Sequence, residues 1–376
     1  MTWPQRRGNP SVALWAGAVC VALLCPRASP ARGPGAGGVA ECTARPLVGV
    51  LSQPGLMQID GVPANYSYIA ASYVKFVEMA GARAVPIPYD APAEEIARIF
   101  QQINGVLLPG GVQDLTPTHR TSYYASAAAL VDLAIAANDA GDYFPLHGTC
   151  LGFEALLVYA AGTAGVLEPF KEDDAAATLD LAAPVSSSRL LSSLTPEVLA
   201  AVEELPLAFE AHMMGASPGA FAGEGAAHPA LGRFYRLVTT SRNSAGQVYA
   251  STIESQAYPI TGTQWHPEKN PFEWLRTPAG ERVPHSANAV RFSQAVANFL
   301  VGEARLSCHA PAGEEAEDAM MIYNYQPLFT GRAAEDATQR IHFTQTYIFP
   351  RWGQGQEGAS ERGEVQGLKK GIASVK

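Results

Sequence analysis

Short apolar runs alternate with helically spaced apolar positions from residue 46 onward. Four runs are predicted to be buried strands, at residues 47–51, 84–87, 105–108 and 144–147. Three stretches with apolar residues at helical spacing are predicted to be helices, at 69–80, 94–102 and 123–140. Strands that alternate with helices predict parallel βαβ units, so we expect an α/β fold with a mostly parallel central sheet flanked by helices.

The alternation stops after Gly165. Residues 170–232 are rich in Ala, Ser, Gly and Pro and are predicted to be loops with one short helix. Three strand-like runs then follow closely, at 234–240, 247–253 and 258–263. Their short connections predict a small antiparallel strand region added to the parallel sheet. A last amphipathic helix is predicted over 287–304.

The N-terminus has the pattern of a secretory signal peptide. Arg6 and Arg7 precede an apolar stretch over 12–24, and small residues and prolines follow. The stretch is too short for a comfortable transmembrane span, and the alternative interpretation is an uncleaved anchor. A secretory route also fits the sequon Asn65-Tyr66-Ser67, which predicts glycosylation at Asn65.

These patterns predict one main domain with extensions at both ends. The expected divisions are a signal peptide at 1–28, a disordered spacer at 29–44, a domain at 45–350 and a disordered tail at 351–376. The 376 residues are 47% hydrophobic, which is enough to bury a sizeable core. Lys and Arg total 26 against 35 Asp and Glu, a net charge of −9. This balance argues against a nucleic-acid or anionic-membrane partner, because both require a basic surface.

The chain contains five cysteines. Cys20 and Cys25 lie in or beside the signal peptide, so Cys42, Cys150 and Cys308 would remain after its removal. An odd number of cysteines in a secreted protein indicates one free thiol. Cys42 and Cys308 flank the domain and could pair, which would leave Cys150 free, but their spacing does not establish this pairing.

The free-thiol candidate lies in a distinctive local sequence. Gly148-Thr149-Cys150-Leu151-Gly152 stands between a predicted strand and a predicted helix. This junction has a cysteine flanked two residues away on each side by glycine. Such a pattern is the cysteine counterpart of the nucleophile elbow. The helix N-terminus favours the reactive thiolate. The alternative is a buried structural cysteine, because free cysteines are often buried.

A candidate base follows the last predicted strand. In Gln264-Trp265-His266-Pro267-Glu268, the His266 imidazole could accept the thiol proton and return it to a leaving amine. The carboxylate of Glu268 could orient the ring and stabilise its charged form. Any one of the eight histidines could be structural, but this order of elbow, strands and His-x-Glu favours catalysis.

A candidate oxyanion site is the Pro109-Gly110-Gly111 sequence after the third predicted strand. The backbone N–H groups of Gly110 and Gly111 could point at a developing oxyanion, with the N–H of Leu151 as a further donor. Taken alone, this segment would be an ordinary glycine-rich turn.

These segments and several others carry a specific resemblance. They are residues 46–51, 68–75 (Tyr-Ile-Ala-Ala-Ser-Tyr-Val-Lys), 80–83, 105–111, 142–145, 148–154, 264–269, 322–323 and 347–349. Together they resemble the class I glutamine amidotransferase fold, which is flavodoxin-like, and within it the γ-glutamyl hydrolase family. The resemblance covers about residues 45–350.

The resemblance implies a cysteine hydrolase that cleaves the γ-glutamyl amide bonds of folylpoly-γ-glutamates through a thioester acyl-enzyme. Cys150 would be the nucleophile and His266 the base, with Glu268 behind it. Neither a metal nor an organic cofactor is implied. A homodimer is suggested, located outside the cell or in a lysosome or vacuole.

The resemblance also implies that Tyr73, Glu154 and His212 line the substrate site. Each has a plainer interpretation. Tyr73 lies on the apolar face of its predicted helix, and Glu154 lies in the first helical turn, where a carboxylate is favoured anyway. His212 falls in the stretch 170–232, where this chain departs most from the pattern. His147 is a further departure, because an aromatic residue is expected before the elbow glycine.

Two other functions remain open from the sequence. One is a glutamine amidotransferase-type glutaminase that passes ammonia to a synthase, although the signal sequence and the lack of a second catalytic domain argue against it. The other is a catalytically inactive binding relative, against which the intact Cys150, His266 and Glu268 argue.

Overall fold

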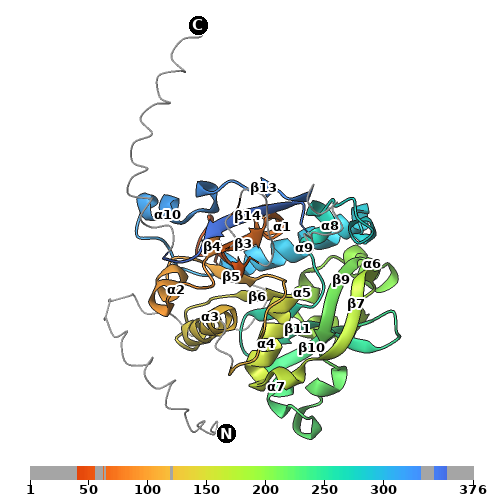
Figure 1. The fold of residues 1–376 in the computed structure, drawn as a ribbon. Helices are drawn as coiled ribbons and strands as arrows, with labels where there is room; N and C mark the ends of the chain where they lie inside the picture. The colour runs from red at the N-terminus through yellow and green to blue at the C-terminus, as the bar shows by residue number, and fades with distance from the viewer. Residues whose placement is uncertain (1–39, 56–61, 63–64, 119–121, 332–342, 354–376) are drawn as a thin grey trace. The chain divides into compact units, whose positions relative to one another are not determined.

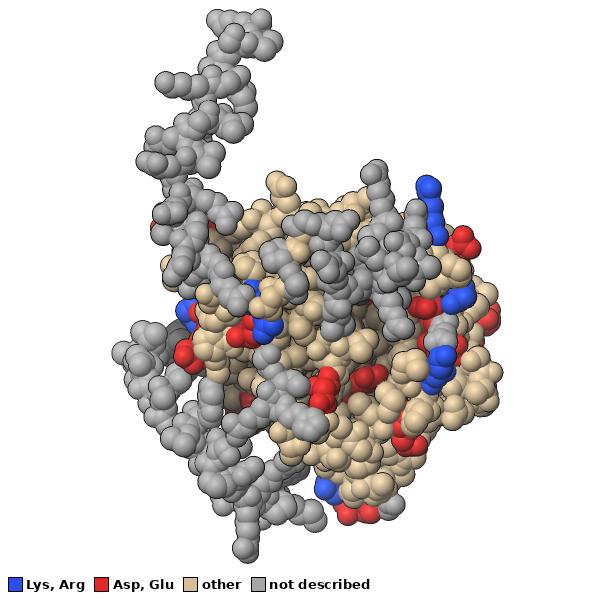
Figure 2. Space-filling view, viewed as in Figure 1, with Lys and Arg blue, Asp and Glu red and all other residues tan. Residues whose placement is uncertain are grey.

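The computed structural model describes residues 40–55, 62, 65–118, 122–331 and 343–353, which all belong to one compact unit spanning residues 37–376 (Figure 1). The predicted signal peptide lies outside the described residues, as do most of the predicted spacer and tail. No helix within the described ranges is long and apolar enough to cross a membrane. On the face shown in Figure 2, the described basic and acidic side chains are interspersed.

The core of the molecule is a mixed eight-stranded sheet. Its strands, in spatial order, are β4 (Arg83–Ile87), β1 (Leu47–Leu51), β5 (Gly105–Leu108), β6 (Leu146–Thr149), β12 (Ile260–Thr263), β11 (Val248–Ser255), β10 (Tyr235–Arg242) and β8 (Asp180–Leu181). The first five strands are mutually parallel, and the pairs from β12 to β8 are antiparallel. The predicted α/β class with a mostly parallel sheet and an added antiparallel region is therefore confirmed.

Helices cover both faces of this sheet (Figure 1). One face carries α1 (Ala71–Glu78), α5 (Arg189–Ser193), α6 (Pro196–Glu204), α8 (Lys269–Phe272) and α9 (Ala287–Ala304). The other carries α2 (Ala93–Phe100), α3 (Ser122–Asp139), α4 (Leu151–Ala161) and α7 (Pro229–Phe234). A further helix, α10 (Glu314–Met320), follows α9 in the chain.

Strand β1 shows why this sheet needs helices on both sides. Leu47 and Leu51 pack into one hydrophobic cluster, whereas Val48 and Val50 pack into the other. Successive side chains of a strand point to opposite faces, so a strand that is apolar at every position must be buried on both. The continuous apolar run seen in the sequence is the local cause of the layered fold.

Two small antiparallel sheets flank the central one. The first has the order β13 (Leu328–Phe329), β14 (Gln345–Pro350), β3 (Tyr66–Ala70) and β2 (Gln53–Pro54). The second pairs β7 (Glu168–Ala177) with β9 (Ala208–Gly215), and we call it the β7–β9 ribbon. The prediction of loops with one short helix over 170–232 was wrong. Pairing between two segments about 40 residues apart, interrupted by two register shifts, stabilises strands that have little β-propensity of their own.

The structure settles the cysteine pairing that the sequence left open. Cys42 and Cys308 form a disulfide with their Cα atoms 5.1 Å apart, and Cys150 is the free cysteine among the residues that the structure describes. The bond joins the segment before β1 to the segment after α9. It therefore ties together the two ends of the main body of the fold, and Cys150 is left as a buried thiol.

Candidate active site

The elbow at Cys150 forms as predicted, between β6 and α4. Cys150 has a φ of 50°, a left-handed conformation that is costly for a residue with a side chain. A Cβ on Gly148 would lie 2.6 Å from the backbone of Gly152, and a Cβ on Gly152 would overlap the carbonyl oxygen of Leu108. Only glycine at these two positions lets α4 approach β5 and β6 closely enough to hold the strained residue.

Gly110 is the point where the predicted groups meet. A Cβ at this position would lie 2.6 Å from Cε1 of His266, 2.7 Å from the Tyr73 hydroxyl and 3.1 Å from Cβ of Cys150. Residues from α1, the segment after β5, the elbow and the segment after β12 therefore converge on one small volume. The shared carboxyl edge of the parallel strands explains this, because β5, β6 and β12 all end there.

The imidazole of His266 is oriented by two neighbours. Its Nδ1 lies 2.7 Å from Oε1 of Glu268 and 3.3 Å from the hydroxyl of Tyr73. With Nδ1 held by a carboxylate, Nε2 is the nitrogen that can exchange a proton with a thiol or an amine. Burial acts to raise the pKa of Glu268, but the adjacent His266 and Lys269 lower it below its usual value, so Glu268 is ionised.

The segment that carries His266 is fixed by packing on both sides. Trp265 stacks on Phe292 of α9 with ring centroids 4.7 Å apart, and its indole N–H donates to Oγ1 of Thr252 at 3.1 Å. The backbone N–H of His266 donates to the carbonyl of Phe209 at 2.8 Å. The β7–β9 ribbon therefore helps to place the candidate base.

The thiol is protonated in this state. Burial raises the pKa of Cys150 well above its ordinary value, and the carboxylates of Glu154 and Glu268 add to the rise. Lys269 and the N–H of Leu151 act in the opposite direction but do not outweigh burial. The helix N-terminus favours the thiolate through the N–H of Leu151, as expected, but burial has the larger effect, so a base must remove the proton during the reaction.

The three predicted oxyanion donors are in different situations. The N–H of Gly110 already donates to the Tyr73 hydroxyl at 2.8 Å. The N–H of Leu151 faces the Cys150 sulfur. No described residue accepts a hydrogen bond from the N–H of Gly111. Leu151 and Gly111 are thus available to an oxyanion, whereas Gly110 is available only if the Tyr73 hydroxyl moves.

Glu154 and His212 are both buried close to the elbow. Glu154 is 8% exposed, accepts a hydrogen bond from Nε2 of Gln264 at 3.3 Å, and has its pKa raised to about 7 by burial. His212 is 6% exposed, with Nδ1 3.0 Å from the carbonyl of Met214 and Nε2 3.3 Å from Oε2 of Glu210. The positive charge of His212 acts on the Glu154 carboxyl, so the two side chains belong to one buried cluster.

Sequence reasoning missed two polar residues that support the site. The buried amide of Gln53 donates to the carbonyl of Gly110 at 2.5 Å and so fixes the backbone of the Pro109-Gly110-Gly111 segment. Glu210 is completely buried beside His212. The spacing Glu-x-His would have placed both on one face of a strand, but the surrounding stretch was interpreted as loop, so the signal was lost.

The unexpected His147 has a structural explanation. Its Nδ1 lies 2.8 Å from Oγ1 of Thr261 and its Nε2 lies 3.4 Å from Oγ1 of Thr263, both on the neighbouring strand β12. Burial lowers the pKa of His147 to about 4, so the ring is neutral. His147 therefore links β6 to β12 through side-chain hydrogen bonds, close to the elbow.

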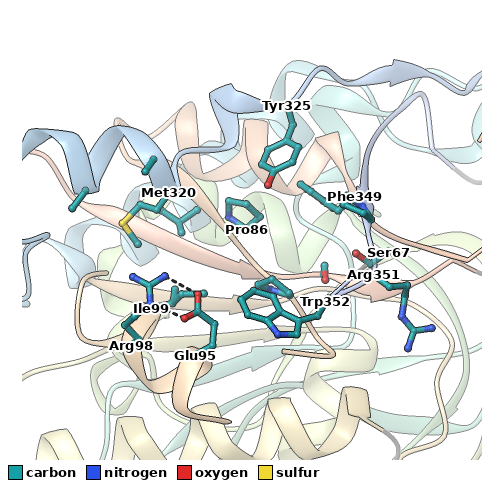
Figure 3. A pocket seen from close by; sticks show the side chains of 17 residues that line it. Ser67, Pro86, Glu95, Arg98, Ile99, Met320, Tyr325, Phe349, Arg351 and Trp352 are labelled. Atoms are coloured by element: carbon teal, nitrogen blue, oxygen red, sulfur yellow. Dashed lines mark hydrogen bonds and ion pairs between the residues drawn. The ribbon is translucent and has the colours of Figure 1, made fainter. Parts of the chain in front are cut away.

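A cavity of about 380 Å³ lies elsewhere in the molecule. Its walls come from α2, β4, α10 and the C-terminal segment, and Figure 3 shows Tyr325 and Phe349 on one side of Pro86 with the paired Glu95 and Arg98 on the other. None of the candidate catalytic and substrate-binding residues lines it. The reactive groups and this cavity therefore belong to different parts of the structure.

The geometry defines a class of protein. A buried thiol on a strained strand-to-helix turn, a histidine held by a carboxylate and free backbone N–H groups form the arrangement of a cysteine-dependent hydrolase that forms an acyl-enzyme. Residues 46–167 match the family model of Peptidase C26.

Comparison with known proteins makes the assignment specific. The chain is 35% identical over 308 residues to Gamma-glutamyl hydrolase 1 of Arabidopsis thaliana, covering 80% of this chain and 83% of the relative. It is 35% identical over 306 residues to Gamma-glutamyl hydrolase of Homo sapiens, covering 81% and 90%. Among solved structures it is similar to the glutaminase domain of Trypanosoma brucei CTPS, at 12% identity and a TM-score of 0.41, covering 65% and 94%. The chain belongs to the γ-glutamyl hydrolase family, and the predicted enzyme class is confirmed.

Proposed function

We propose that this enzyme hydrolyses the γ-glutamyl amide bonds of folylpoly-γ-glutamates, with Cys150 as the nucleophile. The observation that carries the proposal is the convergence of Cys150, His266 and Tyr73 around Gly110, together with the 2.7 Å contact between His266 and Glu268. This arrangement supports transfer of an acyl group to sulfur, and the family membership supports the γ-glutamyl substrate.

The first half of the reaction forms a thioester. Nε2 of His266 takes the proton from the Cys150 thiol, and the sulfur attacks the γ-carbonyl carbon of the glutamyl unit. The resulting imidazolium is stabilised by the ionised Glu268. The imidazolium then gives its proton to the α-nitrogen of the leaving glutamate as the carbon–nitrogen bond breaks.

The second half consumes water. His266 removes a proton from water, the hydroxide adds to the thioester carbonyl, and the thiol leaves with the proton returned by the imidazolium. In both halves the oxyanion accepts hydrogen bonds from the N–H groups of Leu151 and Gly111. The N–H of Gly110 joins them if the Tyr73 hydroxyl gives way.

Glu154 and Tyr73 face the volume where the glutamyl unit would lie, and we assign them to substrate binding. Their burial favours a strong contact with polar groups of the substrate, because a low-dielectric setting strengthens such hydrogen bonds. We assign His212 to the same site, where its charge acts on the Glu154 carboxyl. No metal or organic cofactor has a step in this scheme, and a homodimer is the expected assembly.

The predicted sequon is compatible with a secretory route. Asn65 is exposed, and its Oδ1 accepts a hydrogen bond from Arg351 at 3.0 Å. We propose that the mature enzyme acts outside the cell or in a lysosome or vacuole, with a glycan on Asn65. A mass measurement before and after glycan removal, beside Asn65→Gln, checks the modification.

The test of the activity is hydrolysis of folate tri-γ-glutamate by the purified mature protein and by Cys150→Ala. The parent should release glutamate or short γ-glutamyl peptides, and Cys150→Ala should be slower by about 10⁴-fold or more. Product lengths report whether cleavage is internal or terminal. Thermal unfolding of both proteins checks that the variant is folded.

Two other outcomes would replace the proposal. Release of ammonia from glutamine without cleavage of the folate substrate would favour the glutaminase alternative. Neither reaction, combined with a Cys150 that resists a thiol alkylator, would favour an inactive binding relative.

A further inference from the structure

The buried pair of Glu210 and His212 has no role in the reaction scheme above. The two residues lie two positions apart on β9, so their side chains share one face of the strand. Both side chains are fully buried, with Oε2 of Glu210 3.3 Å from Nε2 of His212. A buried carboxylate needs compensation by charge or hydrogen bonds, and the imidazole is the group beside it that can carry a positive charge.

The contacts of the His212 ring determine its protonation. Nδ1 lies 3.0 Å from the carbonyl oxygen of Met214, and a carbonyl can only accept a hydrogen bond, so Nδ1 carries a proton. Nε2 faces the carboxylate of Glu210, which favours a second proton there. Although burial opposes the charge, Glu210 raises the pKa of His212 above its ordinary value. These contacts favour the imidazolium form of the ring.

The Glu210–His212 pair is connected to the active site through Glu154. Oε1 of Glu210 accepts a hydrogen bond from the hydroxyl of Ser251 at 3.2 Å, and the carbonyl of Ser251 accepts one from the N–H of Gln264 at 2.8 Å. The side chain of Gln264 in turn donates to Glu154 at 3.3 Å. His212 also acts on Glu154 directly, because its positive charge opposes the effect of burial on that carboxyl.

We propose that Glu210 is a positioning residue, which holds His212 as a cation near Glu154 and so favours the charged form of the Glu154 carboxylate in the substrate site. The inference rests on the proposed function only for the identity of the substrate. Glu210 itself is completely buried, with Oε1 hydrogen-bonded to Ser251 of β11 and Oε2 beside His212.

Other charged groups around the pair do not substitute for Glu210. Glu172 stands opposite His212 in the register of the ribbon, but its Oε2 accepts a hydrogen bond from the N–H of Ser244 at 2.6 Å. Tyr249 of β11 packs edge-on against the His212 ring at 4.9 Å, and burial raises its pKa, so it stays neutral. With Glu154 on α4, these complete the titratable groups that face the ring among the described residues.

A direct test measures the titration of His212 by NMR in ¹⁵N-histidine-labelled protein, with His212→Gln to assign the signal. In the parent, both ring nitrogens should remain protonated at neutral pH. In Glu210→Gln, which keeps the size of the side chain and removes its charge, the imidazolium signal should be lost at a lower pH. The matched control is Glu172→Gln, which removes another buried carboxylate of the same ribbon and should leave the titration unchanged.

A second test follows Glu154 through the pH dependence of kcat/KM for folate tri-γ-glutamate. The parent profile should contain a limb with its midpoint near pH 7, the pKa of Glu154, and Glu154→Gln should lack that limb. Without the nearby positive charge of His212, the pKa of Glu154 rises. Glu210→Gln should therefore move the midpoint of the limb upward by about one pH unit. Glu210→Asp, which retains the charge, should restore most of the parent profile.

These measurements separate the inference from the proposed function. A Glu210→Gln variant with unchanged His212 titration and an unmoved limb would overturn the inference, and so would a uniform loss of kcat at all pH values, since that indicates a purely structural role. A parent enzyme that does not cleave the folate substrate would overturn the proposed function instead, while the NMR titration would still decide the role of Glu210.

Discussion

The parallel half of the central sheet and the β7–β9 ribbon contribute different chemistry to one site. The parallel half carries the proposed reacting groups, Cys150 after β6 and His266 after β12. The ribbon holds the backbone of His266 and buries the side chains of Glu210 and His212. In the proposed mechanism, the groups that form bonds thus lie at the sheet edge, and the groups that adjust their protonation lie on the paired ribbon.

The difference follows from how each region is stabilised. The parallel strands are buried on both faces and are held by two hydrophobic clusters, so the residues that follow them are placed with little freedom. The ribbon has only two strands, and its pairing contains two register shifts. A change in the parallel half should therefore destroy activity or folding, whereas a change near the ribbon should shift pH dependence.

After Cys150→Ala, the largest expected effect comes from His266→Gln. Loss of the base leaves a buried thiol whose pKa is raised, so kcat should fall by about 10³-fold with the fold intact. Steady-state hydrolysis of folate tri-γ-glutamate measures the loss. His309→Gln is the control, because His309 pairs with Asp142 at the opposite edge of the sheet, and its activity should stay near that of the parent. Equal losses in both variants would contradict the assignment.

A change in the packing of the elbow should cost stability. In Gly152→Ala the added methyl group would overlap the backbone of Leu108, so the free energy of unfolding should fall by about 4 kcal/mol. In the control, Gly302→Ala on α9, no described atom lies within 4 Å of the new methyl group, and a gain of about 1 kcal/mol is expected. Denaturant unfolding compares them, and similar values for the two variants would speak against the tight elbow.

The smallest effect of the three concerns Glu154, which connects the two regions. Its pKa is raised from 4.5 to about 7 by burial, so the folded state binds the proton more tightly than the unfolded state does. The parent should therefore lose about 2–3 kcal/mol relative to Glu154→Gln as pH rises from 4.5 to 7. Unfolding curves at several pH values measure this, with the exposed Glu315→Gln as control. A parent and Glu154→Gln that respond identically to pH would refute the raised pKa.

The sequence alone was sufficient for the elements whose hydrophobic period is strong. Strands β1 and β5 and helix α9 have the predicted bounds, because each is an uninterrupted apolar run or a full amphipathic repeat. Strand β6 begins two residues later than predicted, because Pro145 has no N–H and the ladder starts with the bond from Leu146 to Pro259. The elbow glycines and the His-x-Glu spacing were likewise visible as local patterns.

Only the tertiary structure determined the features that depend on long-range strand pairing and on burial. The β7–β9 ribbon forms by pairing across about 40 residues, and no local sequence pattern indicates such pairing. The contact between Glu210 and His212 was therefore not predicted. Burial of the Cys150 thiol, which reverses the expected preference for thiolate, depends on every element packed around the elbow. The pairing of Cys42 with Cys308 is of the same kind. Sequence carries residue types and periods, whereas distances and dielectric environment arise only when distant segments meet.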